Sequence, residues 1–563
     1  MHISTLLTLC SLAATSYTQQ APIDIREATI SSLHGSLYSG LTTCRDIVSA
    51  FIARIEHFNP SINAIIALNP DALDIADSLD DALSRGNATG LLFCTPILLK
   101  DNFDAVPMPT TGGCLSLNAS TPIHDSPTVT ALRRAGAVIL GKVNLQELAL
   151  EGLSVSSLGG QTMNPYDFSR TPGGSSGGTG AAIAASFAVF GTGTDTVNSL
   201  RSPASANSLF SFRPTRGLIS RAGVIPISYT QDTAGAIGRC LSDIATALTV
   251  MSSVGHDSND NATAAIPPSV VGTDYTSFLE EMLPSLQGKR IGVLEGFFDR
   301  TSNTNETNPV NEAMDAVITL LRTHGATIVN ITDHIYNATA ISAAMDVQQF
   351  EYRESLTAYL SSLNHLTGEP RPNSMPELYQ YQRRSDGNRN KDFLVIPAQY
   401  SYIQTALRSS TSNSSYFEKQ TLITNLTRSL HDMIISNDLD ALIYPEQKNL
   451  VVPVGSPSQY GRNGILAAVT GSPVVVVPIG FSPPTASGSA PIGIPIGMEI
   501  LGLPWTEGAL LRLAQAIDGR LHARRAPVTN GLNESVEVTN VYDAVPRIIP
   551  LKNLSPTYPL GVY

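Results

Sequence analysis

The spacing of apolar residues along the chain predicts helices that alternate with short strands. Thr43 and Asp46 match a capping box, and the apolar positions after it fall on one helical face: Ile47, Val48, Phe51, Ile52 and Ile55. Ser126 followed by Pro127 predicts a second helix start, and Gly136 marks its end. Because the first helix has a single apolar face, we expect it to pack against a larger core.

Continuous apolar runs predict strands that are buried on both faces. Such runs occur at residues 95–99, 137–140, 292–294 and 474–477, and a helical pattern follows over residues 509–517. Strands of this kind need helices on both sides of their sheet. We therefore expect one large α/β domain over residues 19–525.

The two ends of the chain differ from this domain. Residues 1–18 contain an apolar stretch followed by small polar residues, which predicts a secretory signal peptide. Residues 526–563 are irregular and are expected to form a C-terminal surface tail. No later segment has the ~20 apolar residues of a membrane anchor, so we expect a soluble, secreted protein without a membrane partner.

The composition is that of a globular protein with little charge. Hydrophobic residues make up 42% of the chain and charged residues 15%, with a net charge of -12. Nucleic acids are bound by clustered Lys and Arg, so the acidic balance argues against a nucleic-acid partner. A small neutral substrate fits better, no cofactor or metal is predicted, and the oligomeric state is left open.

Two further features bear on export. Asn-X-Ser/Thr sequons recur along the chain as candidates for glycosylation, at Asn87, Asn118, Asn261, Asn305, Asn330, Asn337, Asn413, Asn425, Asn533 and Asn553. The predicted mature chain keeps an even number of cysteines, compatible with zero, one or two disulfides or with buried free thiols: Cys44, Cys94, Cys114 and Cys240. Their spacings match no zinc site.

A segment rich in glycine and serine, residues 171–180, contains candidate catalytic groups. Ser175 and Ser176 lie between pairs of glycines, and Ser199 follows downstream. Glycine permits sharp turns and the close approach of a substrate, so a serine among glycines is a candidate nucleophile. For this segment alone, a simple Gly/Ser turn is the alternative.

A lysine at the end of a predicted strand supplies a candidate base. Lys100 follows the apolar run 95–99, where burial disfavours its charge. A shift of its pKa from about 10.4 to about 7 requires about 4 kcal/mol, which burial can supply, and a neutral lysine can act as a general base. The alternative is an ion pair of Lys100 with Asp101 or Asp104.

Together these segments resemble the amidase signature family, whose members hydrolyse amide bonds with a Ser-Ser-Lys triad. The similarity extends over most of the chain and includes Lys100-Asp-Asn, residues 137–144, Gly173-Gly-Ser-Ser-Gly-Gly178, Gly193-Thr-Asp195, Ser199-Leu-Arg-Ser-Pro203-Ala, residues 212–217 and residues 493–502. The resemblance implies a single α/β domain with a central mixed β-sheet covered by helices on both faces. It also implies a small-molecule amide substrate, cleaved to a carboxylate and an amine or ammonia.

The resemblance also implies roles for three residues. By motif match, Ser199 is the nucleophile, Ser175 is a bridging serine held by a cis peptide bond, and Lys100 is the base. Lys100 would act through Ser175 to deprotonate Ser199. Ser199 would then form an acyl-enzyme that water hydrolyses.

One segment departs from the family pattern. Val197 and Asn198 stand where the family commonly has two glycines. The resemblance implies an oxyanion hole built from backbone N–H groups of Thr196, Val197, Asn198 and Ser199, and valine adopts positive φ poorly. We expect an active enzyme with a narrowed pocket, and a catalytically inactive secreted binding protein of the same fold is the alternative.

Residues beside the triad have predicted supporting roles. Ser176 is expected to support the relay by hydrogen bonding. Asp195 and Arg201 are expected to form a buried ion pair that fixes the nucleophile loop. Gln231 and Asp232 either face the site or form a turn.

Other functions fit parts of the sequence. Residues 174–178 also match the Gly-X-Ser-X-Gly elbow of α/β-hydrolase esterases, with Ser176 as nucleophile, but the prolines of residues 164–172 oppose the strand that this elbow needs. A phosphate-binding loop would need a lysine that the segment lacks. A subunit of a tRNA-dependent amidotransferase is a further alternative, because such subunits share the family resemblance. The predicted signal peptide and the acidic net charge argue against this function.

Overall fold

A central mixed β-sheet organises the chain, which a computed structural model describes over residues 23–362, 372–381, 397–484 and 489–528. The strands of the sheet are β1 (Ile65–Leu68), β2 (Thr95–Lys100), β3 (Ala137–Val143), β6 (Phe190–Asp195), β7 (Phe210–Arg213), β8 (Thr233–Gly238), β9 (Arg290–Leu294), β10 (Thr327–Ile331), β11 (Ala441–Pro445), β12 (Val474–Phe481) and β13 (Pro495–Leu501). Within the described residues, these eleven strands are ordered β1-β3-β2-β6-β8-β7-β12-β13-β11-β9-β10. A separate pair is formed by β4 (Val155–Ser156) and β5 (Gly160–Gln161).

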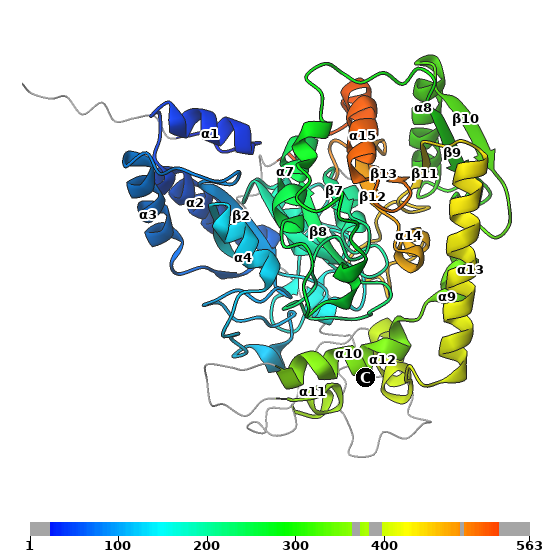
Figure 1. The fold of residues 1–563 in the computed structure, drawn as a ribbon, viewed down its shortest axis with the longest axis horizontal. Helices are drawn as coiled ribbons and strands as arrows, with labels where there is room; N and C mark the ends of the chain where they lie inside the picture. Colours follow the sequence, from blue (N-terminus) through cyan, green and yellow to red (C-terminus); the bar gives the residue numbers. More distant parts are fainter. Residues whose placement is uncertain (1–22, 363–371, 382–396, 485–488, 529–563) are drawn as a thin grey trace, which may run out of the picture.

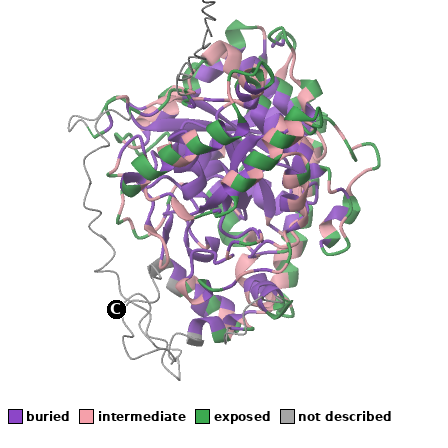
Figure 2. Ribbon diagram, turned by 90° about the vertical axis from the view of Figure 1, so that its left-hand side faces the viewer, coloured by how far each residue is buried: buried purple, intermediate pink, exposed green. Residues whose placement is uncertain are grey.

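Helices flank this sheet, as Figure 1 shows. They are α1 (Ile30–Tyr38), α2 (Cys44–Ile62), α3 (Ala72–Ser84), α4 (Pro127–Arg134), α5 (Gly177–Ala184), α6 (Arg201–Ala206), α7 (Leu241–Ser252), α8 (Asn308–Thr323), α9 (Ala338–Met345), α10 (Gln348–Ser362), α11 (Met375–Tyr381), α12 (Pro397–Arg408), α13 (Ser414–Ser436), α14 (Ile465–Thr470) and α15 (Glu507–Leu521). The strands are largely buried between them (Figure 2), so the predicted α/β class with helices on both faces is confirmed.

The elements predicted from the apolar pattern are present. Thr43 caps α2 in a capping box with Asp46, and of the predicted apolar face only Ile52 is half-buried rather than buried. The Ser126 side chain caps α4 by accepting a hydrogen bond from the N–H of Val129 at 3.2 Å. The predicted strands are all present, and each extends beyond its apolar run.

The strand pairing brings two distant segments to one edge of the sheet. β2 pairs in parallel with both β3 and β6. The carboxyl ends of parallel strands lie at the same edge, where polar side chains can meet. Lys100 ends β2 and Asp195 ends β6, so these two residues and the loop that follows β6 lie close together.

The glycines of residues 173–178 serve close packing more than positive φ. A Cβ atom on Gly178 would lie 2.0 Å from the backbone oxygen of Asn144, which excludes any side chain there. In this run, all of which is described, Gly173 is the one glycine with positive φ, at +68°. The segment enters α5 at Gly177, so it holds a helix start against the loop after β3.

One disulfide is formed in the described part of the chain, between Cys44 and Cys94. It joins the start of α2 to the residue before β2, while Cys114 and Cys240 carry free thiols. No helix within residues 23–362, 372–381, 397–484 and 489–528 combines the length and the apolar character needed to span a bilayer.

The structure describes eight of the ten candidate glycosylation sites and only part of each chain end. Seven of the candidate asparagines are exposed and Asn337 is half-buried, whereas Asn533 and Asn553 lie outside the described residues. Residues 1–18 lie outside them as well, and of the predicted tail only 526–528 are described.

Candidate active site

Lys100 and Ser175 form a buried hydrogen-bonded pair. The Lys100 Nζ atom lies 2.8 Å from Ser175 Oγ, and neither side chain has exposed surface. The peptide bond between Gly174 and Ser175 is cis, as the resemblance implies. Two residues separated by 75 positions in sequence are thus brought into direct contact.

Burial lowers the pKa of Lys100 to about 7, although the negative charges of Asp195 and Asp232 oppose the shift. The alternative of an ion pair with Asp101 or Asp104 is wrong. The carboxylate of Asp101 accepts a hydrogen bond from Lys142 Nζ at 3.2 Å, and that of Asp104 accepts from the hydroxyl of Tyr359 at 2.7 Å. A substantial fraction of the Lys100 amines is therefore unprotonated, and so uncharged, near pH 7.

Thr194 is a second partner of this lysine. Its Oγ1 atom lies 2.8 Å from Lys100 Nζ and 3.0 Å from Asn102 Nδ2. The hydroxyl thus holds Nζ from the side of β6, while Ser175 holds it from the loop before α5. The sequence pointed to neither Thr194 nor Asn102, because each is only one of several polar residues in its motif.

Ser199 lies in the turn between β6 and α6, hydrogen-bonded to the residue that follows Ser175. Its backbone oxygen accepts a hydrogen bond from the N–H of Ser176 at 3.3 Å, and its side chain is 8% exposed. The Ser176 hydroxyl donates to the backbone oxygen of Thr194 at 3.3 Å, so it ties the loop to β6 rather than bonding to Lys100 or Ser175. The backbone of Ser176 thus joins the Gly/Ser segment to the turn that carries Ser199.

A buried network of charges fixes the turn that carries Ser199. Arg201 Nη2 and Nε each lie 3.0 Å from the carboxylate of Asp195, and Nη1 lies 2.7 Å from Glu499. Arg213 adds a second contact to Asp195 at 2.7 Å. Burial would raise the pKa of Asp195, but the two guanidinium groups hold it at about 2. The predicted ion pair of Asp195 with Arg201 is thus present within a larger network.

Val197 and Asn198 adopt ordinary backbone conformations. Neither has a positive φ, so a β-branched residue causes no conformational conflict there. Within the described part of the chain, the N–H groups of Val197, Asn198 and Ser199 are bonded to no protein acceptor. The protein thus leaves these donors unused, and an oxyanion hole needs donors of this kind.

The side chain of Asn198 is turned into the protein. Its Nδ2 atom donates to Oε1 of Glu446 at 3.0 Å, and both side chains are fully buried. Burial and the nearby charge of Glu499 raise the pKa of Glu446 to about 8. A glycine at position 198 would leave this contact unmade.

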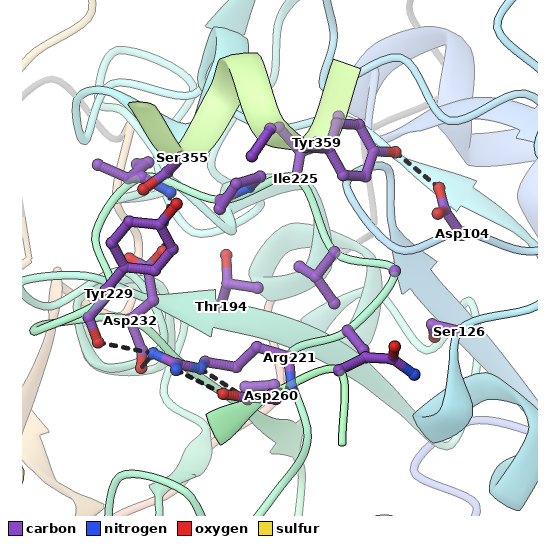
Figure 3. Close-up of a pocket in the computed structure, with 18 of the residues that line it drawn as sticks. Asp104, Ser126, Thr194, Arg221, Ile225, Tyr229, Asp232, Asp260, Ser355 and Tyr359 are labelled. Atoms are coloured by element: carbon purple, nitrogen blue, oxygen red, sulfur yellow. Dashed lines mark hydrogen bonds and ion pairs between the residues drawn. The ribbon is translucent and has the colours of Figure 1, made fainter. Parts of the chain in front are cut away.

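A cavity of about 620 Å³ opens beside these residues (Figure 3). Thr194 and Thr196 form part of its wall, and Lys100 contacts Thr194, whereas Lys100, Ser175 and Ser199 are not themselves in the wall. Its volume falls within the range of about 300–1,000 Å³ typical of small-molecule sites.

Both possibilities for Gln231 and Asp232 are met in part. Gln231 lies in a turn, which the N–H of Asp232 closes by donating to the backbone oxygen of Ser228 at 3.0 Å. Asp232 lines the cavity and accepts a hydrogen bond from Thr196 Oγ1 at 2.6 Å.

Comparison with known proteins decides the family. The profile of the Amidase family matches residues 46–511. The chain belongs to the amidase family. It is 31% identical over 516 residues to a probable amidase of Arabidopsis thaliana, covering 89% of this chain and 92% of that protein. It is 29% identical over 519 residues to one component of the chloroplastic/mitochondrial glutamyl-tRNA(Gln) amidotransferase of Sorghum bicolor, covering 88% and 89%.

A solved structure supports the same family assignment. The native peptide amidase of Stenotrophomonas maltophilia superposes with a TM-score of 0.77 at 32% identity, covering 89% of this chain and 98% of that protein. The chain is thus an amidase-family hydrolase that cleaves amide bonds. The α/β-hydrolase alternative fails on the fold as well, because residues 162–176, which are all described, contain no strand to carry an elbow at Ser176.

Several residues of the amidase site could not be found from the sequence. Glu446 lies in no motif, and only the fold brings it to Asn198. Arg213 and Glu499 lie within family-like segments, but no role was predicted for them. Glu499 could have been noticed in the sequence, because it is an acidic residue inside the largely apolar segment 493–502. An acid in a buried strand needs a partner of opposite charge. Among the described residues, no group of three His, Cys, Asp or Glu side chains is arranged to hold a metal ion.

Proposed function

We propose that this amidase is a secreted enzyme that hydrolyses small amides through an acyl-enzyme on Ser199, with Ser175 as proton relay and Lys100 as base. The observation that carries the proposal is the contact of 2.8 Å between Lys100 Nζ and Ser175 Oγ, at a lysine that has no exposed surface and no ion-pair partner among the described residues. Such an amine is neutral in a useful fraction at physiological pH, because burial lowers its pKa to about 7.

The first half of the proposed reaction forms the acyl-enzyme. Ser199 Oγ attacks the amide carbonyl carbon while its proton passes to Ser175, and the proton of Ser175 passes to Lys100. The negative charge on the carbonyl oxygen is stabilised by the N–H groups of residues 197–199. The carbon–nitrogen bond then breaks, and the leaving amine takes the proton back from Lys100 through Ser175.

The second half uses the same groups. Water adds to the ester carbonyl as Ser175 and Lys100 remove its proton. The ester bond then breaks, the proton returns to Ser199, and the carboxylic acid leaves. Each turnover thus consumes one amide and one water, and the protein returns to its starting state.

Export is proposed from three separate features. Residues 1–18 have the pattern of a signal peptide, and most of the candidate sequons lie on exposed residues. The disulfide between Cys44 and Cys94 is the kind of bond that persists in oxidising compartments. We accordingly assign residues 1–18 to the signal, 19–525 to the amidase domain and 526–563 to a tail.

A labelling experiment tests the nucleophile. The purified protein is treated with a fluorophosphonate and the modified peptide is identified by mass spectrometry. Label on Ser199 that is lost in Lys100→Ala supports the proposal. Label on Ser176 overturns the assignment of the nucleophile, and the absence of label together with no hydrolysis across an amide panel favours a binding protein of this fold.

Export is tested separately. The full-length chain is expressed in a eukaryotic host, and the medium is analysed for the protein, its N-terminal residue and a mass shift on deglycosylation. Recovery from the medium with a new N-terminus near residue 19 supports secretion. Retention of the intact chain inside the cell contradicts it.

A further inference from the structure

The cavity beside the proposed triad carries acidic side chains on its wall. Figure 3 shows Asp104, Asp232 and Asp260 around it, and Asp125 completes the set. Much of the remaining wall is apolar and comes from residues 222–227. A carboxylate that faces such a cavity needs a partner, because an unpaired buried charge is costly.

Three of these carboxylates are held either by an arginine or by several hydrogen-bond donors. Asp125 pairs with Arg133 at 2.8 Å, and Asp260 pairs with Arg221 at 2.7 Å. Both oxygens of Asp232 are engaged: Oδ1 accepts from the hydroxyl of Thr196, and Oδ2 accepts from the N–H groups of Ile227 and Ser228 at 2.8 Å.

Among the described residues, Asp104 has no arginine partner and no backbone N–H donor to its carboxylate. The residue is 6% exposed, and, as for Asp232, no Lys or Arg of the described chain lies within ion-pair distance of it. Its hydrogen-bond donors are the hydroxyls of Tyr359 and Thr110. The neighbouring cation, Lys142, is bonded to Asp101 and to the backbone oxygen of Phe103 instead. The Tyr359 hydroxyl donates to Oδ1 of Asp104 at 2.7 Å.

The hydroxyl of Tyr359 and the carboxylate of Asp104 together suit a cation. A phenol that donates its proton to a carboxylate keeps its own oxygen free to accept. An ammonium group placed beside this hydrogen-bonded pair would therefore find an acceptor on each residue, and the apolar wall at Val224 and Ile225 would contact a methylene chain. Burial raises the pKa of Asp104 to about 6, so the carboxylate is ionised at pH 8.

We infer that this cavity selects amides whose acyl part carries a protonated amine, with the ammonium bound by Asp104 and Tyr359. This inference rests on the proposed function, because the amide must be hydrolysed at the adjacent Ser199. It adds a substrate class to the general amidase activity of the family, and it assigns Asp104 as the residue that determines this preference.

Matched substrates test the inference. The kcat/KM values for 6-aminohexanamide and hexanamide, and for 4-aminobutanamide and butanamide, are measured at pH 8 from ammonia release. We expect the wild-type enzyme to prefer at least one amino amide over its neutral partner by about ten-fold or more, the range of a hydrogen bond to a charged group. In Asp104→Asn the preference should disappear through a higher KM, with the neutral amides hydrolysed at the wild-type rate.

Control variants separate a local charge effect from general damage. Asp125→Asn removes a carboxylate of the same cavity that is already paired, so it should keep the preference. Tyr359→Phe should weaken the preference and leave the neutral amides unaffected. Equal wild-type rates on both members of each pair would overturn the inference, and so would an Asp104→Asn variant that folds but loses both activities equally. Failure to hydrolyse any amide, without label on Ser199, would instead overturn the proposed function.

Discussion

Asn198 donates a hydrogen bond to Glu446 at 3.0 Å, which joins residues 248 positions apart in the sequence. The neighbouring Val197 backbone oxygen is held by Arg201, whose Nη2 also donates to the backbone oxygen of Gly464 at 3.0 Å. The loop that would form the oxyanion hole is therefore held by side chains and backbone from the second half of the chain. Long-range contacts thus hold the two positions at which the sequence differs from the usual glycines.

The first prediction concerns this contact. Glu446→Ala removes the acceptor of the Asn198 amide and leaves a buried donor unpaired, at a cost of about 1–3 kcal/mol. If the loop binds the transition state, kcat should fall about ten-fold with little change in KM. Glu446→Gln keeps an acceptor oxygen and should retain most of the activity.

A double-mutant cycle distinguishes positioning from general damage. In an Asn198→Gly background the amide is absent, so adding Glu446→Ala should have little further effect on kcat. Steady-state kinetics of the four proteins give the coupling. Two effects that simply multiply would show that Glu446 does not act through Asn198.

The second prediction is a pH dependence of stability. Burial raises the pKa of Glu446 to about 8, above its ordinary value of 4.5. Between these values the folded state holds a proton that the unfolded state has released, so stability is lost as pH rises toward about 8. Glu446→Gln should therefore gain stability relative to wild type between about pH 5 and pH 8, as measured by urea unfolding. A constant difference across that range would contradict the assignment.

The third prediction is a pH dependence of activity. Because the pKa of Lys100 is lowered to about 7, kcat/KM for a neutral amide should rise with pH up to about 7 and then level off. Lys100→Ala should lower kcat/KM by about 10²–10⁴-fold. Lys100→Arg, which keeps a permanent charge, should be equally inactive, and substantial activity in this variant would exclude the lysine as base.

The fourth prediction concerns the buried ion network. Arg201→Met leaves Asp195 and Glu499 without their shared partner, and the loss of one member of a buried pair costs about 3–5 kcal/mol. Urea denaturation should show this loss directly. Arg85→Met removes an exposed pair with Asp81 and serves as the control, in which the midpoint should hardly move.

The fifth prediction concerns the disulfide. Cys44 and Cys94 close a loop with a sequence separation of 50, so loss of the bond should cost about 2–4 kcal/mol through the unfolded chain. The Cys44→Ser/Cys94→Ser variant should unfold at lower denaturant, and a reductant should no longer change its midpoint. Cys240→Ser should remain as sensitive to reductant as wild type, and a wild-type protein indifferent to reductant would argue that the bond is absent.

Features that depend only on residues close together in the sequence could be predicted from it. The capping box at Thr43 and the apolar run ending at Lys100 depend on neighbouring residues, and both appear as predicted. The motif around Ser175 is local as well, and the cis peptide bond that the resemblance implies is present there. Burial of Lys100 was also predictable, because the residue terminates a continuous apolar strand.

The remainder depends on pairings between distant segments. β12 inserts between β7 and β13, and no local pattern encodes that order. Glu446 directly follows β11, which pairs with β13, and the strand order brings it to Asn198, 248 positions away. The hydrogen bond between Tyr359 and Asp104 likewise spans 255 positions. The poor fit of valine to positive φ has no effect at Val197, because the backbone there does not have the positive φ that favours glycine.

The burial of Lys100 and Ser175 has a consequence for the path of protons. Neither side chain has exposed surface, so a proton on this pair has no direct route to bulk water. In the proposed mechanism, the proton taken from Ser199 stays in the protein until the leaving amine removes it. That proton leaves with the amine at the end of the first half, and a proton from the attacking water takes its place in the second half, so the same nitrogen atom carries two different protons in each turnover.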